Sequence, residues 1–381
     1  MIYLDNGATS FPKPKEVSEE VEKCLKEYCA NPGRGAHNMS IECDFKIMKC
    51  RENISKLFNV KNPLNVIFTS NTTDALNIVI NGLIREKDHV ISSYLEHNSV
   101  LRPLRHKERQ GTEVSLIRGD KNGKLSVQDI KREIKPNTKA IILNHGSNVI
   151  GTIQDIEKIG QLAKNKGILF IVDGAQTSGK IEIDMEKYNI DFLAVPGHKG
   201  LLGPQGTGAL CIRNKISFEA LKYGGTGSQS SSMEQPEFLP DKFESGTLNT
   251  PGIVGLSKGI EFINRVGLEK IKEKEIELTN YLIQELRSLD FVECYGPLDE
   301  KEKTSIVSFN LKGMESSEVG RGLNDRNIYV RTGYHCCPLV HKLIGTENRG
   351  TVRVSIGYFN SKEDLDELIF SVKEIYNEKI Q

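Results

Sequence analysis

Two residues at the ends of predicted strands could together carry out one kind of chemistry. The apolar segment Ile168–Val172 ends in Asp173, and the segment Asp191–Val195 is followed closely by Lys199. In open α/β sheets ligands bind outside the carboxyl ends of the strands, so we expect both side chains at a cofactor site. A lysine amine forms an imine with an aldehyde, and an aspartate keeps a pyridine nitrogen protonated so that the ring withdraws electrons from a substrate's α-carbon. The pair predicts pyridoxal 5′-phosphate (PLP), with Lys199 holding its aldehyde carbon.

The other requirements of PLP also have candidates. The phosphate fits the N-terminus of a helix that opens at Ser70–Thr73, where free backbone N–H groups and the helix dipole favour an anion. His97 is suited to stack on the pyridine ring, Asn148 and Gln176 to hydrogen-bond its phenolic oxygen, and Arg353 to bind a substrate carboxylate through two hydrogen bonds. Each residue alone has an ordinary structural explanation, such as a strand-end cap or a solvated strand residue. Their joint order along the chain favours the cofactor site.

A nucleotide-binding loop is one alternative for the segment after the Asp173 strand. Gly174–Lys180 nearly spells the phosphate-binding loop of nucleotide hydrolases, but Ile181 stands where that loop needs a hydroxyl to hold Mg²⁺. The glycine-rich segments 203–208 and 224–227 open no helix after a strand, so we interpret them as turns. We therefore rank nucleotide binding low.

A metal site at Cys336 and Cys337, with His335 and His341, is a second alternative. Adjacent cysteines are poor joint ligands for one tetrahedral zinc, and the chain has no second C-x-x-C pair. We predict no metal. Cys337 is either inert or able to resolve a persulfide on Cys336.

The elements that must position these residues form an alternating pattern of strands and helices, which predicts a mainly parallel sheet covered on both faces. Expected strands lie at 66–69, 89–92, 140–144, 168–173, 192–195 and 209–212, with helices from about Thr73 and over 156–166. Residues 224–251 lack periodicity and predict a long loop near a site. Two helical patterns over 251–289 lead to strands near 306–311, 328–330 and 352–356. A last helix after Ser361 is expected to bury Leu365, Leu368, Ile369, Val372 and Ile375.

Composition excludes several classes of protein. The 381 residues include 51 basic and 51 acidic side chains with no long run of one sign, so neither a nucleic acid nor a membrane is expected as a partner. The N-terminus lacks a secretion signal, and no segment is apolar enough to span a bilayer. The eight scattered cysteines do not resemble a disulfide framework. We expect a cytoplasmic enzyme with a large domain and a smaller one.

The chain resembles the class V aminotransferases, and within them the group II cysteine desulfurases and selenocysteine lyases. The matching segments run in family order over nearly the whole chain. They are 3–8 (YLDNGA), 34–37 (RGAH), 71–75 (NTTDA), 96–98 (EHN), 147–151 (SNVIG), 173–176 (DGAQ), 197–199 (GHK), 243–247 (FESGT), 331–336 (RTGYHC) and 352–355 (VRVS).

The resemblance implies a PLP-dependent transferase fold of the aspartate-aminotransferase type (fold type I, α/β). The large domain, residues 13–250, is expected to hold a mainly parallel seven-stranded sheet. The small α+β domain is expected over 251–381, with residues 1–12 packed near it. The resemblance also implies a homodimer whose two subunits share each active site.

The resemblance further assigns roles to individual residues. Lys199 is the imine lysine and, with Cys336 and His97, is catalytic. The residues assigned to the cofactor are Thr72, Thr73, His97, Asn148, Asp173, Gln176, His198, Lys199 and, from the neighbouring subunit, Thr247. The residues assigned to the substrate are His37, Asn148, Arg331 and Arg353.

The implied reaction removes sulfur from L-cysteine, or selenium from L-selenocysteine, and leaves alanine and a persulfide on Cys336, which a sulfur-acceptor protein could then take. His97 is expected to relay a proton. Two positions depart from the family: Pro196 replaces a serine that binds phosphate, and Tyr334 replaces a common histidine. Three alternatives stay open: another PLP aminotransferase, epimerase or lyase that would not need Cys336, a nucleotide-binding protein, and a non-catalytic persulfide carrier.

Overall fold

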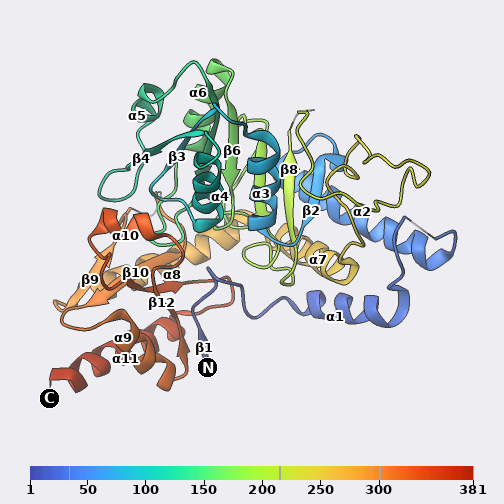
Figure 1. Ribbon diagram of the computed structural model, residues 1–381. Coiled ribbons are helices and arrows are strands. Elements are labelled where there is room, and N and C mark those ends of the chain that lie inside the picture. The colour runs from blue at the N-terminus through green and yellow to red at the C-terminus, as the bar shows by residue number, and fades with distance from the viewer. Residues whose placement is uncertain (34, 214–215, 300–301, 381) are drawn as a thin grey trace.

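A computed structural model describes residues 1–33, 35–213, 216–299 and 302–380 (Figure 1). Arg34, within one of the family segments, lies outside the described residues. The chain forms a large sheet flanked by helices, and a smaller antiparallel sheet built from the last third of the chain.

The large sheet has seven strands in the order β2-β8-β7-β6-β5-β3-β4. Only β8 runs opposite to the other six strands, so the prediction of a mainly parallel seven-stranded sheet is confirmed. The strands are β2 (Val66–Thr69), β3 (His89–Ser93), β4 (Glu113–Ile117), β5 (Thr138–Asn144), β6 (Leu169–Asp173), β7 (Phe192–Pro196) and β8 (Gly208–Ile212).

Side-chain alternation along these strands divides the large core into two faces. Ile171 and Ala194 pack with α3 (Thr72–Leu83) and α4 (Asn98–Glu108) on one face. Val172 and Val195 pack on the other face, which is covered by α2 (Asn38–Phe58), α6 (Ile156–Lys166) and α7 (Thr250–Val266). Because both faces are covered, the strands inside this sheet are buried and mostly apolar, as the sequence pattern predicts. The first helix of the chain is α1 (Lys15–Lys23), which continues as a π-helix (Cys24–Tyr28). Two further short elements are a 3₁₀ turn (Pro63–Asn65) and α5 (Val127–Arg132).

The small sheet has the order β12-β13-β10-β9 and is antiparallel throughout. Its strands are β9 (Val292–Tyr295), β10 (Ile306–Leu311), β12 (Arg331–Gly333) and β13 (Thr351–Ser355). It packs with α8 (Leu268–Arg287), α9 (Ser316–Asp325) and α11 (Lys362–Ile380), and α11 buries the five predicted apolar residues. The short helix α10 (Pro338–Ile344) instead contributes Val340 to the large core.

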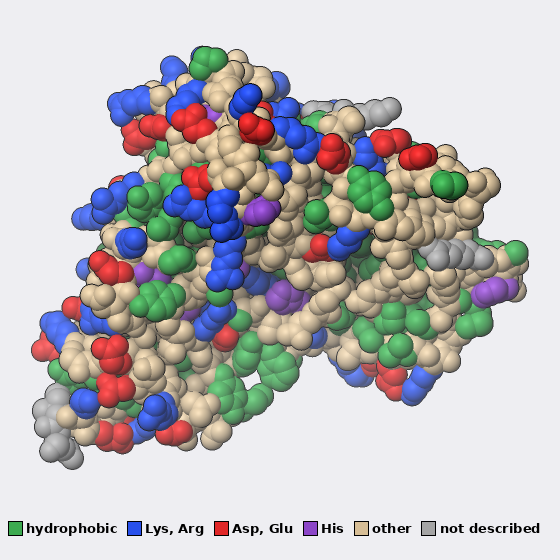
Figure 2. Space-filling view, viewed as in Figure 1, with side chains coloured by type: hydrophobic (Ala, Val, Ile, Leu, Met, Phe, Trp, Pro, Cys, Tyr) green, Lys and Arg blue, Asp and Glu red, His purple; other side chains and the backbone are tan. Residues whose placement is uncertain are grey.

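The N-terminus joins the small sheet through a separate parallel pair, β1 (Ile2–Tyr3) with β11 (Ile328–Tyr329). The apolar face of α7 belongs to the core of the large sheet. The domain boundary after Thr250 stays a prediction. None of the described helices is long and apolar enough to cross a membrane, and side chains of both signs are spread over the face in Figure 2.

Candidate active site

A cavity of about 210 Å³ lies at the carboxyl ends of the central parallel strands. Every residue predicted to contact the cofactor lines it, except Thr247. The lining residues are Ala8, Asn71, Thr72, Thr73, His97, Ser99, Asn144, Gly146, Asn148, Asp173, Ala175, Gln176, Pro196, His198 and Lys199. The topology explains this convergence, because β5, β6 and β7 are neighbouring parallel strands whose ends meet at one edge.

Lys199 follows the end of β7 and projects into the cavity. Burial, followed by the nearby Arg353 cation, lowers the pKa of its amine to about 8, and the Asp173 carboxylate partly opposes both effects. A lysine with a lowered pKa is neutral for a larger fraction of the time near physiological pH, which makes it a better nucleophile towards a carbonyl carbon. This is the environment that an imine-forming lysine requires.

Asp173 is the last residue of β6 and is 3% exposed. One carboxylate oxygen accepts the backbone N–H of Ala175 at 2.9 Å. Burial raises the pKa of this carboxyl, while the Ala175 N–H and the Lys199 cation act in the opposite direction. A protonated pyridine nitrogen beside it would supply the cation that favours its ionised form.

An anion site lies at the start of α3. The Asn71 side chain caps this helix by accepting the Asp74 N–H at 3.0 Å. The Thr72 Oγ1 and His198 Nδ1 atoms are buried in the cavity wall, with no hydrogen-bond partner in the described part of the chain. Because buried polar groups are nearly always hydrogen-bonded, these two atoms fit a ligand such as the PLP phosphate.

His97 is the N-cap of α4, and its ring is fixed by Ser99. Its Nδ1 accepts the Ser99 backbone N–H at 3.0 Å and lies 2.7 Å from the Ser99 hydroxyl, which is 2.6 Å from the Thr73 hydroxyl. An accepting Nδ1 leaves the ring proton on Nε2. Burial, followed by the Lys199 and Arg331 cations, lowers the His97 pKa to about 4. The ring is therefore neutral at physiological pH.

The loop that carries Cys336 follows β12 and is held from two sides. Asn98 donates its backbone N–H to the Cys336 carbonyl at 2.9 Å, and the Asn148 side chain donates to the His335 carbonyl at 2.8 Å. Cys336 is partly exposed, and its sulfur lies 3.5 Å from Arg331 Nη2. It does not line the cavity itself.

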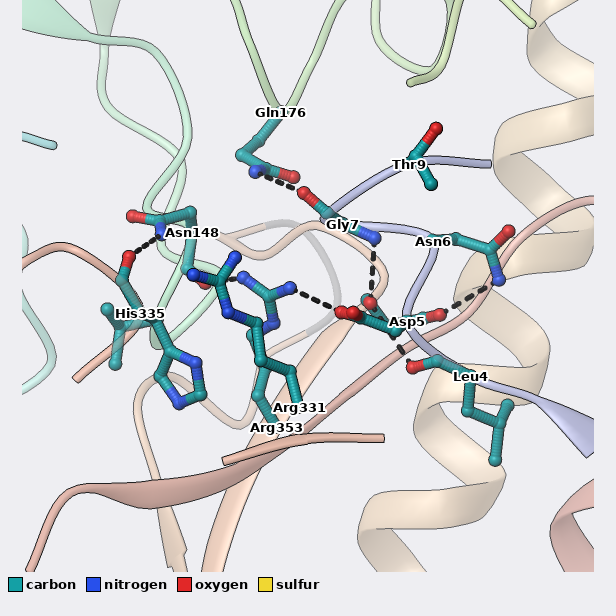
Figure 3. Close-up of polar contacts among 12 residues, drawn as sticks. Leu4, Asp5, Asn6, Gly7, Thr9, Asn148, Gln176, Arg331, His335 and Arg353 are labelled. Atoms are coloured by element: carbon teal, nitrogen blue, oxygen red, sulfur yellow. Dashed lines mark hydrogen bonds and ion pairs between the residues drawn. The ribbon is translucent and has the colours of Figure 1, made fainter. Parts of the chain in front are cut away.

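Arg353 lies on β13 and is fully buried. The alternative that it is an ordinary solvated strand residue is therefore excluded. Its Nη2 lies 2.7 Å from an Asp5 carboxylate oxygen, and its Nη1 donates to the Asn148 carbonyl at 3.0 Å (Figure 3). Its Nε has no partner among the described residues. Arg331 extends alongside it, so two guanidinium groups flank the Asn148 end of the site.

Five predicted site residues do not line this cavity. Arg331, Arg353 and Cys336 lie around Asn148 at its edge, and the other two lie elsewhere. His37 is an exposed residue that caps α2 by accepting the Ser40 N–H at 3.3 Å. Thr247 lines a second cavity of about 260 Å³, next to the buried ion pair of Arg51 with Glu244. The assignment of Thr247 to the active site of a neighbouring subunit stays a prediction.

The sequence interpretation missed the contribution of residues 5–13. The Gly7 carbonyl accepts Gln176 Nε2 at 3.0 Å, and Ala8 lines the cavity. The His198 carbonyl accepts the Ser10 backbone N–H at 3.0 Å and Lys13 Nζ at 2.8 Å. This segment has no apolar period, so its role has no signal in the sequence except its match to the family.

The two alternative sites are not supported. Lys180, the lysine of the loop that resembles a nucleotide site, donates to Glu275 at 2.7 Å, to Ser305 at 2.9 Å and to the Ile356 carbonyl at 3.1 Å. All three of its protons are used within the protein, which leaves none for a phosphate. In the described ranges, no group of three or more potential ligand side chains could hold a metal ion.

Comparison with known proteins decides the family. The sequence model of the class V aminotransferase family matches residues 2–368 of this chain. The chain belongs to the class V aminotransferase family. That family uses PLP, and this chain is a cysteine desulfurase-like member of it.

Individual relatives are similar over nearly their full length. A probable cysteine desulfurase of Methanothermobacter thermautotrophicus is 36% identical, covering 98% of this chain and 94% of the relative. One from Pyrococcus abyssi is 34% identical, with the same coverage of both chains. The apo structure of a cysteine desulfurase from Thermococcus onnurineus is 35% identical with a TM-score of 0.93, covering 98% of this chain and 94% of the other. The Escherichia coli cysteine desulfurase CsdA is 25% identical with a TM-score of 0.90, at the same coverage. These findings confirm the predicted family and fold.

Proposed function

We propose that this protein binds PLP and removes sulfur from L-cysteine, or selenium from L-selenocysteine, to give L-alanine and a persulfide on Cys336. The observation that carries the proposal is that Lys199 and Asp173 face one cavity, with the Cys336 loop held against the residues of its rim.

The cavity residues suit the parts of the cofactor. Lys199 would hold the aldehyde carbon, Asp173 the pyridine nitrogen, and the α3 N-terminus with Thr72 and His198 the phosphate. His97 would lie against the ring, and Gln176 beside the phenolic oxygen. When bound, PLP supplies the electron-withdrawing ring that makes the α-hydrogen of an amino acid acidic.

The protein's own groups would then act on the substrate. Arg353 still has its Nε free to pair with the substrate carboxylate. Lys199, with its lowered pKa, is suited to move the proton at the α-carbon. His97 carries its proton on Nε2 and is suited to pass one proton on.

Cys336 would complete the reaction. Its thiolate attacks the substrate sulfur, so that one S–S bond forms, the Cβ–S bond breaks and a proton returns to Cβ. The overall conversion of cysteine and Cys336–SH to alanine and Cys336–S–SH is balanced without any further oxidant. Arg331 Nη2 lies 3.5 Å from this sulfur, within reach to donate a hydrogen bond to it.

We also propose a homodimer in which Thr247 of one subunit completes the site of the other. The support is that Thr247 and His37 lie outside the cavity formed by their own subunit. Mixing Lys199→Ala and Thr247→Ala subunits tests this proposal, because only a shared site restores activity in hybrid dimers. A sulfur-acceptor protein is proposed as the partner that takes the persulfide sulfur.

The deciding experiment measures alanine production from L-cysteine and L-selenocysteine by the purified protein. PLP bound to a lysine should absorb near 420 nm, roughly where the cofactor's imine does, and Lys199→Ala should lose that band. Cys336→Ala should keep the band and lose alanine production from cysteine. Equal alanine production by the parent and Cys336→Ala would exclude the thiolate mechanism and favour another class V reaction.

A further inference from the structure

The second cysteine of the Cys336–Cys337 pair occupies a different environment from the first. Cys337 is fully buried and is the N-cap residue of α10, whereas Cys336 is partly exposed. The Cys337 thiol donates to Asn148 Oδ1 at 2.6 Å, and the Cys336 sulfur lies beside Arg331. The two thiols therefore contact different partners.

The Asn148 amide links the Cys337 thiol to the loop that carries Cys336. A side-chain amide accepts through its oxygen and donates through its nitrogen, so a donor at Oδ1 fixes which end of the amide faces which neighbour. Asn148 Nδ2 consequently donates to the His335 carbonyl at 2.8 Å (Figure 3). A rotated amide would place two donors against Cys337 and an acceptor against the His335 carbonyl.

The loop needs such contacts because its backbone is strained. His335 has φ of 49° and Cys336 has φ of 60°, in the left-handed region that side chains disfavour by about 1–2 kcal/mol per residue. Strained residues of this kind persist only where surrounding contacts hold them. Here the contacts are Asn148 on the His335 carbonyl and Asn98 on the Cys336 carbonyl.

We propose that Cys337 is a positioning residue: its S–H orients Asn148, which holds the His335–Cys336 turn in its left-handed conformation beside the cavity. This inference rests on the proposed function, in which Cys336 receives the sulfur. Cys337 itself neither carries nor resolves that sulfur.

The competing role for Cys337 has a defined chemistry. Its thiolate would attack the persulfide on Cys336, forming a Cys336–Cys337 disulfide and releasing HS⁻. That step needs a deprotonated, accessible Cys337. Burial raises the pKa of the Cys337 thiol well above its usual value, and the Glu96 carboxylate acts in the same direction. The thiol therefore stays protonated and serves as a donor.

The test compares Cys337→Ala with Cys337→Ser in the PLP-loaded enzyme. Serine keeps an O–H donor, and its shorter C–O bond relieves the short contact to Asn148, whereas alanine leaves Oδ1 without a donor. Cys50→Ala is the matched control, because it removes a fully buried thiol from α2 in the large core. The readouts are the rate of Cys336 alkylation by iodoacetamide, kcat and KM for L-cysteine, and the position of the persulfide by tandem mass spectrometry.

We expect Cys337→Ala to alkylate Cys336 about fivefold faster and to lower kcat by about the same factor, as expected for the loss of one hydrogen bond worth about 1 kcal/mol. KM should stay within about twofold, and serine should restore both quantities. Alanine behaving like the Cys50 control, serine failing to restore, or sulfur on Cys337 would overturn the proposal. If the parent made no alanine from cysteine, the proposed function would fail, but the alkylation rates would still decide the role of Cys337.

Discussion

The carboxylate of Asp5 lies 2.7 Å from the guanidinium of Arg353, which is 348 residues further along the chain and fully buried. The two side chains join the N-terminal segment to strand β13, next to the candidate substrate site (Figure 3).

Asp5→Asn should destabilise the protein by leaving a buried cation without its counter-charge. Removing one partner of a buried pair costs about 3–5 kcal/mol, and because the Asp5 side chain is 21% exposed we expect about 1–3 kcal/mol. The measurement is the urea midpoint of unfolding. Glu19→Gln is the control, since it breaks a surface pair with Lys15 whose side chains are 57% and 85% exposed, and it should have almost no effect. Equal midpoints for the two variants would contradict the prediction.

Lys180→Met should destabilise the contact between the two sheets. It should not change nucleotide binding, because we expect the parent protein to bind no nucleotide. Lys180 and Glu275 are both nearly buried, and Ser305 also donates to the same Glu275 oxygen. Removing the cation leaves that carboxylate buried and unpaired, at a cost of about 3 kcal/mol. Thermal unfolding of Lys180→Met and of the exposed Lys187→Met would be compared. Specific ATP binding by the parent that Lys180→Met abolished would contradict our interpretation of this lysine.

Uptake of PLP by the cofactor-free protein should rise with pH around a midpoint near 8. The pKa of Lys199 is lowered to about 8, so its amine becomes neutral, and able to attack a carbonyl, well below the usual lysine pKa of about 10.4. The same sign holds for stability: the penalty for the buried ammonium is full below pH 8 and is lost progressively as the pH rises from 8 to the unfolded pKa of about 10.4. Uptake would be followed by absorbance, and Arg353→Met should move the midpoint upward by removing a nearby cation. A midpoint near 10 in the parent would show that the site does not depress this pKa.

Pro196→Ser should strengthen PLP binding. Pro196 lines the cavity where the family usually has a phosphate-binding serine, so the variant restores one hydroxyl. One added hydrogen bond to a charged group contributes about 1.5–3 kcal/mol at best, which corresponds to roughly tenfold tighter binding or somewhat more. Equilibrium dialysis of PLP measures the change, and Thr72→Val should act in the opposite direction. Unchanged affinity in both variants would place the phosphate elsewhere.

His97→Phe should separate stacking from proton transfer. The phenyl ring keeps a flat surface against the cofactor, so PLP affinity should stay within a few-fold, whereas the loss of a proton relay should lower kcat by about 10²-fold or more. Because the pKa of His97 is about 4, the parent's activity should show no inflection near pH 6.5 from this residue. Full turnover by His97→Phe would exclude the relay.

Much of the large sheet could be predicted because its inner strands are buried on both faces and are therefore mostly apolar. Strand β4 was missed because it is an edge strand whose residues Glu113–Leu116 are exposed or half-buried. Strand β9 was missed for the same reason, since all four of its residues are half-buried. Such strands depend on a neighbour's hydrogen bonds rather than on a hydrophobic pattern.

The residues of the candidate site also divide into those that the sequence could predict and those that it could not. Asp173 and Lys199 could be placed because one is the last residue of a strand and the other follows a strand closely, and both strand ends are visible in the sequence. The contacts of Gly7, Ser10 and Lys13 with that site could not be foreseen, because they are made largely through backbone carbonyls that carry no sequence signature. The sequence also left open whether Arg353 is buried, since an arginine on a strand is usually solvated.

The route of the N-terminal segment has a consequence for how the protein is made. Residues 2–3 pair with 328–329, and Asp5 pairs with Arg353, so each of these residues binds a partner that the ribosome adds more than 300 positions later. A nascent chain therefore cannot close its catalytic centre until Arg353 has emerged. We expect ribosome-bound chains that stop before residue 328 to bind the cofactor poorly, even when the whole large sheet has emerged.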